Sequence, residues 1–312
     1  MIEKSKGYIP VMLTPFTESG AVDFGGLTKL TELYLQAGAA GLFANCQSSE
    51  MFNLSAEEQL AVTEHVLHVA GGAVPVVATG TFGGAVEKQA DFVKRMYETG
   101  VEAVIVITNM LAGESESADV FDERFGHLLD ATADIPLGFY ECPEPFKRVL
   151  TAEQLKRFVS TGRVIYHKDT CLDIEQIRAK LDATKQVTEF DLYDAYMVHA
   201  VESLKAGSAG LSCIQGNYYP ELIVWLCNHY DSDELADQVA RVQQFFIDHM
   251  EVMHAVYPIV AKYFLQKRGL PISTFTRKNA GIFDETVRTR MDSFYRQFQQ
   301  LVEQIDLKSV WV

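Results

Sequence analysis

An amine follows an apolar run near the middle of this chain. Lys168 closes the run 164–168 (VIYHK) and is followed at once by Asp169, so it falls where a buried strand is expected to give way to a loop. Burial disfavours the ammonium form of a lysine, and the neutral amine is the nucleophile that forms a Schiff base with a ketone. The alternative is a strand-end lysine whose head reaches water along its aliphatic stem. Lys168 alone does not decide between the two.

Two more segments place polar side chains after apolar runs. Tyr140 ends the run 136–140, and Gln47, Ser48 and Ser49 follow the run 41–44. A pyruvate-type Schiff base needs an amine, a group that moves protons, and hydroxyl and N–H donors that hold the carboxylate. We predict that Tyr140 is the proton donor and acceptor beside the nucleophile Lys168. Ser48 and Ser49 are predicted to hold the carboxylate, and Ser48 to relay protons to Tyr140.

Each of these assignments has a structural alternative. A tyrosine at a strand end is often a packed aromatic with its hydroxyl at the rim, and a serine pair in a loop often caps the following helix. The three segments together favour the functional interpretation, provided that the fold brings them to one place.

Eight short apolar runs alternate with amphipathic stretches up to about residue 225, which predicts a parallel sheet with right-handed crossovers. The candidate strands are residues 8–13, 41–44, 74–78, 103–107, 136–140, 164–168, 186–190 and 210–213. No GxGxxG follows the first strand, and eight units of this size match an α/β fold of the (β/α)8 TIM barrel type better than an open doubly wound sheet. In such a barrel the carboxyl ends of all strands share one face, so the three segments converge there.

Helix signals support this division of the chain. Ser55 with Glu58 and Thr151 with Gln154 read as capping boxes, and residues 85–98 have helical spacing that ends before a glycine. After residue 230 the pattern changes to helices alone. We predict a barrel over residues 1–230 that carries the Schiff-base site, and a C-terminal three-helix domain over residues 231–312. The three helices expected there cover residues 234–250, 254–268 and 284–305.

Composition excludes several other classes of protein. The formal net charge is −15 over 312 residues, which argues against binding to a nucleic-acid backbone. No apolar run approaches the roughly 20 residues that span a bilayer, and no signal-peptide pattern opens the chain, so we expect a cytoplasmic protein with no membrane partner. Five cysteines without a CxxC or a histidine at ligand spacing predict neither a disulfide framework nor a metal site.

At these residues the chain resembles the dihydrodipicolinate synthase and N-acetylneuraminate lyase family of Schiff-base aldolases. The matching segments are 7–10, 13–16, Glu50 with 54–58, Tyr140 with Pro143, Lys168 with Asp169, and 207–212 with Asn217 and Pro220. The resemblance implies a barrel with a C-terminal helical domain and a homotetramer or homodimer. It also implies an imine between Lys168 and pyruvate or another 2-keto acid, with no metal or organic cofactor. Gln47, Ser212 and Cys213 join Ser49 as candidate substrate contacts.

The chain also departs from the family pattern. The family's Gly-Thr/Ser-Thr-Gly-Glu segment reads Cys-Gln-Ser-Ser-Glu at 46–50, and residues 108–111 lack the tyrosine that dihydrodipicolinate synthases place there. The arginine that those synthases carry after Tyr140 is also absent. Glu141 and Glu144 are expected to repel a dicarboxylic partner at the mouth of the site. Lys147 and Arg148 are the nearest replacement cations, although we expect them to be solvated charges.

We therefore predict a pyruvate-dependent class I lyase that cleaves or forms a carbon–carbon bond next to a pyruvate-derived imine. A 2-keto-3-deoxy sugar acid or a similar 2-keto acid is the expected substrate. The alternatives are 4-hydroxy-tetrahydrodipicolinate synthase activity, a keto-acid dehydratase, and a non-catalytic keto-acid-binding protein.

Overall fold

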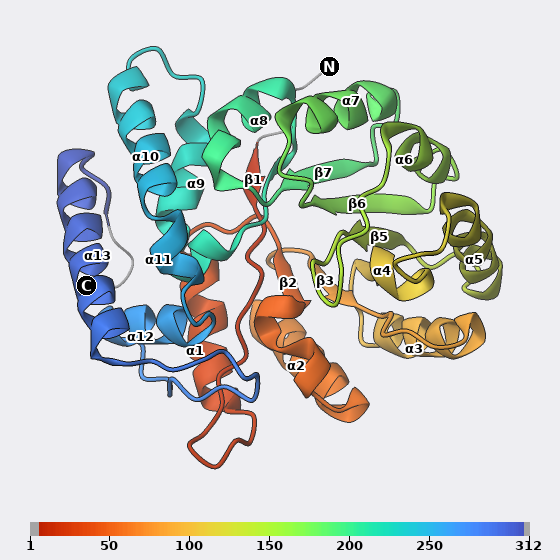
Figure 1. The fold of residues 1–312 in the computed structure, drawn as a ribbon, viewed down its shortest axis with the longest axis horizontal. Coiled ribbons are helices and arrows are strands. Elements are labelled where there is room, and N and C mark those ends of the chain that lie inside the picture. Colours follow the sequence, from red (N-terminus) through yellow and green to blue (C-terminus); the bar gives the residue numbers. More distant parts are fainter. Residues whose placement is uncertain (1–5, 309–312) are drawn as a thin grey trace.

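The computed structural model describes residues 6–308, and a barrel of eight parallel strands lies at its centre (Figure 1). The strands are β1 (Gly7–Tyr8), β2 (Leu42–Asn45), β3 (Val76–Thr79), β4 (Ala103–Ile107), β5 (Leu137–Tyr140), β6 (Val164–Asp169), β7 (Asp191–Asp194) and β8 (Gly210–Leu211). They pair in the order β1-β8-β7-β6-β5-β4-β3-β2. Backbone hydrogen bonds from Phe43 to Pro10 (3.0 Å) and from Met12 to Phe43 (3.1 Å) join the two ends. The predicted (β/α)8 barrel is confirmed.

Helices surround the strands, and a further set follows the last strand. The helices are α1 (Phe24–Gln36), α2 (Ala56–Ala70), α3 (Val86–Glu98), α4 (Thr108–Leu111), α5 (Ala118–Ala131), α6 (Ala152–Val159), α7 (Ile174–Thr184), α8 (Ala200–Ala206), α9 (Pro220–His229), α10 (Ala236–Asp248), α11 (Met250–His254), α12 (Ile259–Lys267) and α13 (Glu285–Gln304). Figure 1 shows α10 to α13 gathered at one side of the barrel, near α9 and α1. Among residues 6–308, no helix combines the length and the apolar character needed to cross a bilayer.

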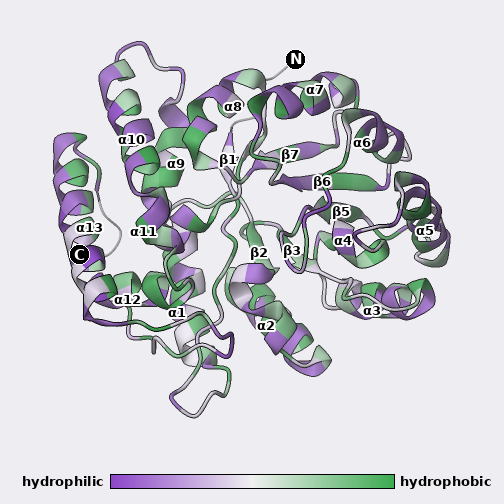
Figure 2. Ribbon diagram, in the orientation of Figure 1, coloured by the Kyte–Doolittle hydropathy of each residue, from purple (hydrophilic) through white to green (hydrophobic). Residues whose placement is uncertain are grey.

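Local sequence signals account for where several helices begin. The Ser55 hydroxyl accepts from the Glu58 N–H (3.2 Å) while the Glu58 carboxylate accepts from the Ser55 N–H (2.9 Å). Thr151 and Gln154 make the same reciprocal pair at the start of α6. Both predicted capping boxes are confirmed. In Figure 2 the ribbons of α3 and α13 alternate between hydrophilic and hydrophobic colours, as expected of helices with one face against the core.

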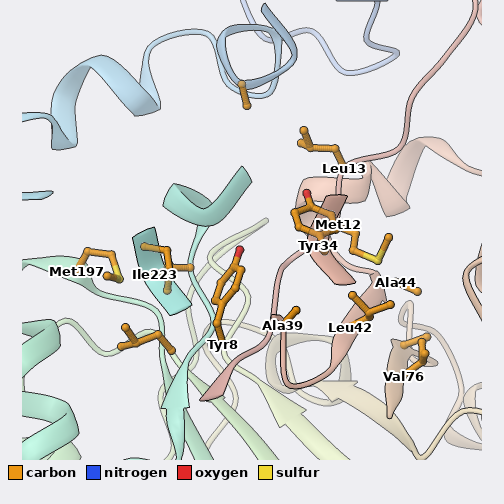
Figure 3. Close-up of a cluster of buried hydrophobic side chains, with 14 of the residues drawn as sticks. Tyr8, Met12, Leu13, Tyr34, Ala39, Leu42, Ala44, Val76, Met197 and Ile223 are labelled. Carbon is orange, nitrogen blue, oxygen red and sulfur yellow. The ribbon is translucent and has the colours of Figure 1, made fainter. Parts of the chain in front are cut away.

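Successive strand residues point to opposite sides of the barrel wall and so build two apolar layers. Leu42 and Ala44 face outward into the cluster drawn in Figure 3, where they lie near Tyr34 of α1. Phe43, between them, points into the barrel and belongs to the inner cluster with Tyr166. The side chains at the carboxyl ends of the strands pack on this inner apolar layer.

The seventh strand is where the sequence-based prediction of the sheet is wrong. Residues 186–190 form no strand, and β7 is the next segment, Asp191–Asp194. A strand with two acidic residues does not look like a buried strand in sequence, but Asp194 is fully buried and lies 2.9 Å from the His199 ring. The prediction followed the apolar residues Val187 and Phe190, which pack outside the sheet against the core.

The C-terminal part also differs from the prediction. Between residues 231 and 308 four helices are present instead of three, because α11 forms between the first two expected helices and residues 255–258 of the second are not helical. α11 ends at His254 and α12 begins at Ile259. Pro258 lacks a backbone N–H and clashes with the preceding turn, so it is disfavoured in a helix interior, and it lies at the N-cap of α12. The irregular segment that results carries Tyr257 to the mouth of the barrel.

Candidate functional site

A cavity of about 440 Å³ opens at the carboxyl ends of the strands, and we call it the strand-end cavity. Its wall takes side chains from the segment after β2, the ends of β5 and β6, and the irregular segment before α12. The lining residues include Gln47, Ser48, Tyr140, Glu144, Lys147, Lys168, Tyr257 and Lys278. The three segments that the sequence analysis singled out therefore meet at one place.

Lys168 and Tyr140 are direct neighbours in this wall. Their Cα atoms are register partners on the parallel strands β5 and β6, so both side chains point into the barrel. The Lys168 ammonium nitrogen lies 4.0 Å from the centre of the Tyr140 ring. Phe43 and Tyr166, packed edge to face below, complete an apolar floor.

The surroundings of Lys168 favour its neutral form. Its side chain is only 5% exposed, and no salt bridge within residues 6–308 involves it. Burial is the main cause that lowers the pKa of Lys168 below its ordinary value. The neighbouring thiols, chiefly Cys46 and Cys142, act in the opposite direction but do not outweigh burial. A larger share of this amine is therefore nucleophilic at neutral pH than of a lysine in water.

Tyr140 remains a phenol under the same conditions. Burial raises its pKa well above the ordinary value, and its hydroxyl donates to Oε1 of Gln47 at 3.0 Å. Because Gln47 lies in the cavity wall, this bond holds the phenol at the edge of the space that a ligand on Lys168 would occupy.

Ser48 lies in the cavity wall but does not contact Tyr140. Its Oγ accepts a hydrogen bond from the Tyr257 hydroxyl at 2.8 Å. The predicted relay from Ser48 to Tyr140 is not present in the structure, since Gln47 occupies the position next to the phenol. The Ser48 side chain lines the cavity, and its role toward a ligand stays a prediction.

Three predicted substrate contacts do not reach the cavity. The fully buried Ser49 hydroxyl lies 2.7 Å from the Met12 carbonyl and accepts from the Cys46 N–H, so it stabilises the turn after β2. Ser212 is fully buried and accepts from the Tyr166 hydroxyl at 3.3 Å, beneath the cavity floor. Cys213 is 1% exposed, and burial raises the pKa of its thiol to about 12. These residues are structural parts of the barrel.

A buried charge cluster lies on the outer side of the same strand ends. Glu141, His167 and Asp169 bring ligand-type atoms within 4.8 Å of one another, as a metal site would. The Lys180 ammonium from α7 lies 2.7 Å from Glu141 and 2.6 Å from Asp169, so a fixed cation already occupies the position between the carboxylates. Although burial alone would lower the pKa of His167, the carboxylates of Glu141 and Asp169, each 3.4 Å from its Nε2 atom, raise it. The four groups balance in charge when His167 is protonated.

The mouth of the cavity is not acidic, contrary to the prediction. Glu141 is fully buried in the cluster behind the wall, and Glu144 forms an ion pair with Lys278. Lys147 lines the cavity and donates to the Thr170 carbonyl, so it is not the freely solvated charge that we expected. Arg148 lies elsewhere, bound to the carbonyls of two loop residues, Gly113 and Glu116. Around the mouth, two lysines face one glutamate.

Sequence analysis missed Tyr257 as a site residue. It lies inside a segment that was predicted to be helical, where a side chain in the extension has no reason to meet the barrel mouth. The signal was present in Pro258, because a proline in the middle of an apparent helix marks an interruption.

Comparison with known proteins gives a consistent result. The model of the dihydrodipicolinate synthetase family matches residues 4–297. The 4-hydroxy-tetrahydrodipicolinate synthase of Bacillus subtilis (strain 168) is 25% identical over 266 residues, 84% of this chain and 89% of the relative. The enzyme of the same name from Ectopseudomonas mendocina is 24% identical over 264 residues, 85% of this chain and 88% of the relative.

Solved structures share the fold at lower identity. A prophage protein of the dihydrodipicolinic acid synthase family from E. coli K12, in complex with pyruvate, superposes with a TM-score of 0.83 at 22% identity and covers 97% of this chain and 99% of its own. A monomeric dihydrodipicolinate synthase variant gives a TM-score of 0.85 at 20% identity, with 95% and 98% covered. CdNal from Clostridium difficile, in complex with mannosamine, gives 0.82 at 14% identity, with 94% and 99% covered.

Proposed function

The chain belongs to the dihydrodipicolinate synthetase family, and from this premise we propose that it is a class I lyase acting on a 2-keto acid through an imine on Lys168. The observation that carries the proposal is the buried amine of Lys168, without a salt bridge in the described chain and 4.0 Å from the Tyr140 ring, in a cavity large enough for a small ligand.

The chemistry follows from the order of the groups. The Lys168 amine attacks the keto carbon, water leaves, and the protonated imine that forms draws electrons from the neighbouring carbon–carbon bond. When that bond breaks, the electron pair remains in an enamine on the lysine. Tyr140, a neutral phenol, accepts the proton from the hydroxyl of the departing aldehyde and passes on its own hydrogen, which is the proton that the enamine carbon then receives. The enamine is then protonated at carbon, and water releases pyruvate and the free amine. The imine itself is the electron sink, so the proposal requires no metal and no organic cofactor.

A 2-keto-3-deoxy sugar acid or a similar hydroxylated 2-keto acid is the proposed substrate. Gln47, Gln215 and Tyr196 line the cavity and offer amide and phenol groups to which several hydroxyls can bond. The Ser48 hydroxyl, also in the cavity wall, suits the carboxylate next to the keto group.

A second candidate is the condensation performed by 4-hydroxy-tetrahydrodipicolinate synthases. It is favoured by the lysines at the mouth, Lys147 and Lys278, which accommodate a second carboxylate. The burial of Glu141 removes the repulsion that had argued against such a partner.

A substrate panel separates these functions. We expect pyruvate release from 2-keto-3-deoxygluconate or a related sugar acid, loss of release in Lys168→Met, and roughly a hundredfold slower release in Tyr140→Phe. Lys185→Met is the matched control, because Lys185 is exposed and its one salt bridge within residues 6–308 is with Asp182 on the surface. If the condensation of pyruvate with aspartate semialdehyde were the one reaction of the panel that the protein catalyses, the second candidate would be favoured. Full activity of Lys168→Met on any substrate would contradict both.

A further inference from the structure

A chain of hydrogen bonds runs from the packed core to the strand-end cavity. Tyr34 of α1 donates to Oδ1 of Asn217, the Asn217 amide donates to the Tyr257 hydroxyl at 2.7 Å, and Tyr257 donates to Ser48 at 2.8 Å. Figure 3 shows the inner end of this chain, with Tyr34 among the side chains of the core. Of the four residues, Ser48 and Tyr257 line the cavity. The chain thus links the barrel core and the C-terminal helices to one hydroxyl group.

The backbone carbonyl of Val11 fixes the direction of every bond in this chain. A carbonyl only accepts, so the Asn217 atom 2.9 Å from it must be the amide nitrogen, and the amide oxygen must face Tyr34. The second amide hydrogen then goes to the Tyr257 oxygen, which leaves the Tyr257 hydrogen for Ser48. Ser48 is therefore an acceptor toward Tyr257. Its own hydrogen meets no other acceptor in the described chain and is available to the cavity.

This direction does not change with pH in the ordinary range. Tyr34 and Asn217 are fully buried, and the Asn217 amide neither gains nor loses a proton. Burial raises the pKa of Tyr257 far above its ordinary value, although the Ser48 hydrogen bond acts the other way, so the phenol keeps its hydrogen. A chain that ends at an amide cannot carry protons onward. It supplies a donor of fixed direction.

We propose that Tyr257 is a positioning residue that commits the Ser48 hydroxyl to donate to the carboxylate of the 2-keto acid. The inference rests on the function proposed above and deepens it, because it names the residue that orients the Ser48 hydroxyl toward the carboxylate of the ligand. Because the Ser48 oxygen already accepts a hydrogen bond, rotating the hydroxyl away from the cavity would cost free energy. A hydrogen bond to a charged acceptor is also stronger than one to a neutral group. Tyr257 thereby gives the C-terminal helices a part in ligand recognition.

The test measures how much pyruvate is needed to label Lys168. The protein is titrated with pyruvate in the presence of borohydride, and the half-maximal concentration and maximal rate of adduct formation are read by mass spectrometry. In Tyr257→Phe the half-maximal concentration should rise by about tenfold with little change in maximal rate, as expected for loss of support to one charge-assisted hydrogen bond. Tyr263→Phe is the control. It removes a tyrosine hydroxyl from the same helical part of the protein, but that hydroxyl donates to Asp292 outside the cavity.

Two further arms separate a positioning role from general destabilisation. Ser48→Ala should raise the half-maximal concentration by a similar factor, and adding Tyr257→Phe to it should raise it no further, because Tyr257 acts only through Ser48. The preference for pyruvate over pyruvamide, which lacks the negative charge, should shrink in Tyr257→Phe by the same factor. Additive effects of the two substitutions, or an unchanged half-maximal concentration in Tyr257→Phe, would overturn the inference. No adduct in the wild-type protein would instead contradict the proposed function, and the carboxylate assignment with it.

Discussion

Burial acts in opposite ways on the two reactive groups of this site. It lowers the pKa of Lys168 and raises that of Tyr140, because in each case the low-dielectric surroundings favour the neutral form. The neutral amine can attack a carbonyl. The phenol stays protonated until it exchanges a proton with an oxygen atom of the reacting substrate. Both groups suit an imine mechanism at neutral pH.

The pH dependence of imine formation follows from the lowered pKa of Lys168. The neutral amine is the reactive form, so the rate should rise with pH up to the pKa of Lys168 and then become constant. Because that pKa lies below the ordinary value for lysine, the plateau should begin at a lower pH than for a lysine side chain in water. The check is the initial rate of formation of the borohydride-trapped adduct across a pH series. The reference is a blocked lysine, in which the α-amino group is blocked and the side-chain amine is free. A profile that coincides with that of the blocked lysine would show that burial does not activate the amine.

The sequence predicted which residue types meet at the site. It did not predict which of two neighbouring residues, such as Ser48 and Ser49, faces the cavity. Lys168, Tyr140 and Ser48 were expected at the site and lie in the cavity wall. Ser49 turns into the backbone of its own loop, since the short helical turn after β2 rotates successive side chains away from strand alternation. That rotation depends on three-dimensional contacts, such as the Met12 carbonyl, that sequence spacing does not show.

At the scale of elements, the cluster behind the site ties α7 to the ends of β5 and β6. Glu141 follows Tyr140 in the chain, and Asp169 follows Lys168, so the two reactive residues and the two carboxylates point to opposite sides of the same strand ends. The Lys180 ammonium holds both carboxylates. The cluster therefore sets the geometry of the strand ends that carry the site.

Lys180→Met should destabilise the protein strongly. The substitution leaves two buried carboxylates without their cation, and breaking a buried ion pair in this way costs about 3–5 kcal/mol. Lys185→Met, at the C-cap of α7 with an exposed partner, should change stability by less than about 1 kcal/mol. Thermal unfolding of both variants beside the wild type gives the comparison. Equal unfolding temperatures for the two variants would show that the cluster does not hold these elements together.

At the scale of the whole molecule, the alternation of strands and helices was sufficient to predict the barrel. The position of β7 was not predictable, because its Asp194 is accommodated by burial beside His199, a contact between separate elements. The route of the C-terminal part was equally hidden. Only the folded chain shows that the interruption at Pro258 brings Tyr257 to the barrel mouth, 2.8 Å from Ser48.

Assignment of the borohydride-trapped pyruvate adduct to one residue tests the central claim most directly. After reduction with pyruvate, proteolysis and peptide sequencing by mass spectrometry should place the modification on Lys168 alone, and Lys168→Met should show none. Lys147 and Lys278 are the internal comparison, because their amines line the same cavity but are engaged by the Thr170 carbonyl and by Glu144. Modification of either of these in place of Lys168, or an unmodified wild-type protein, would contradict the account.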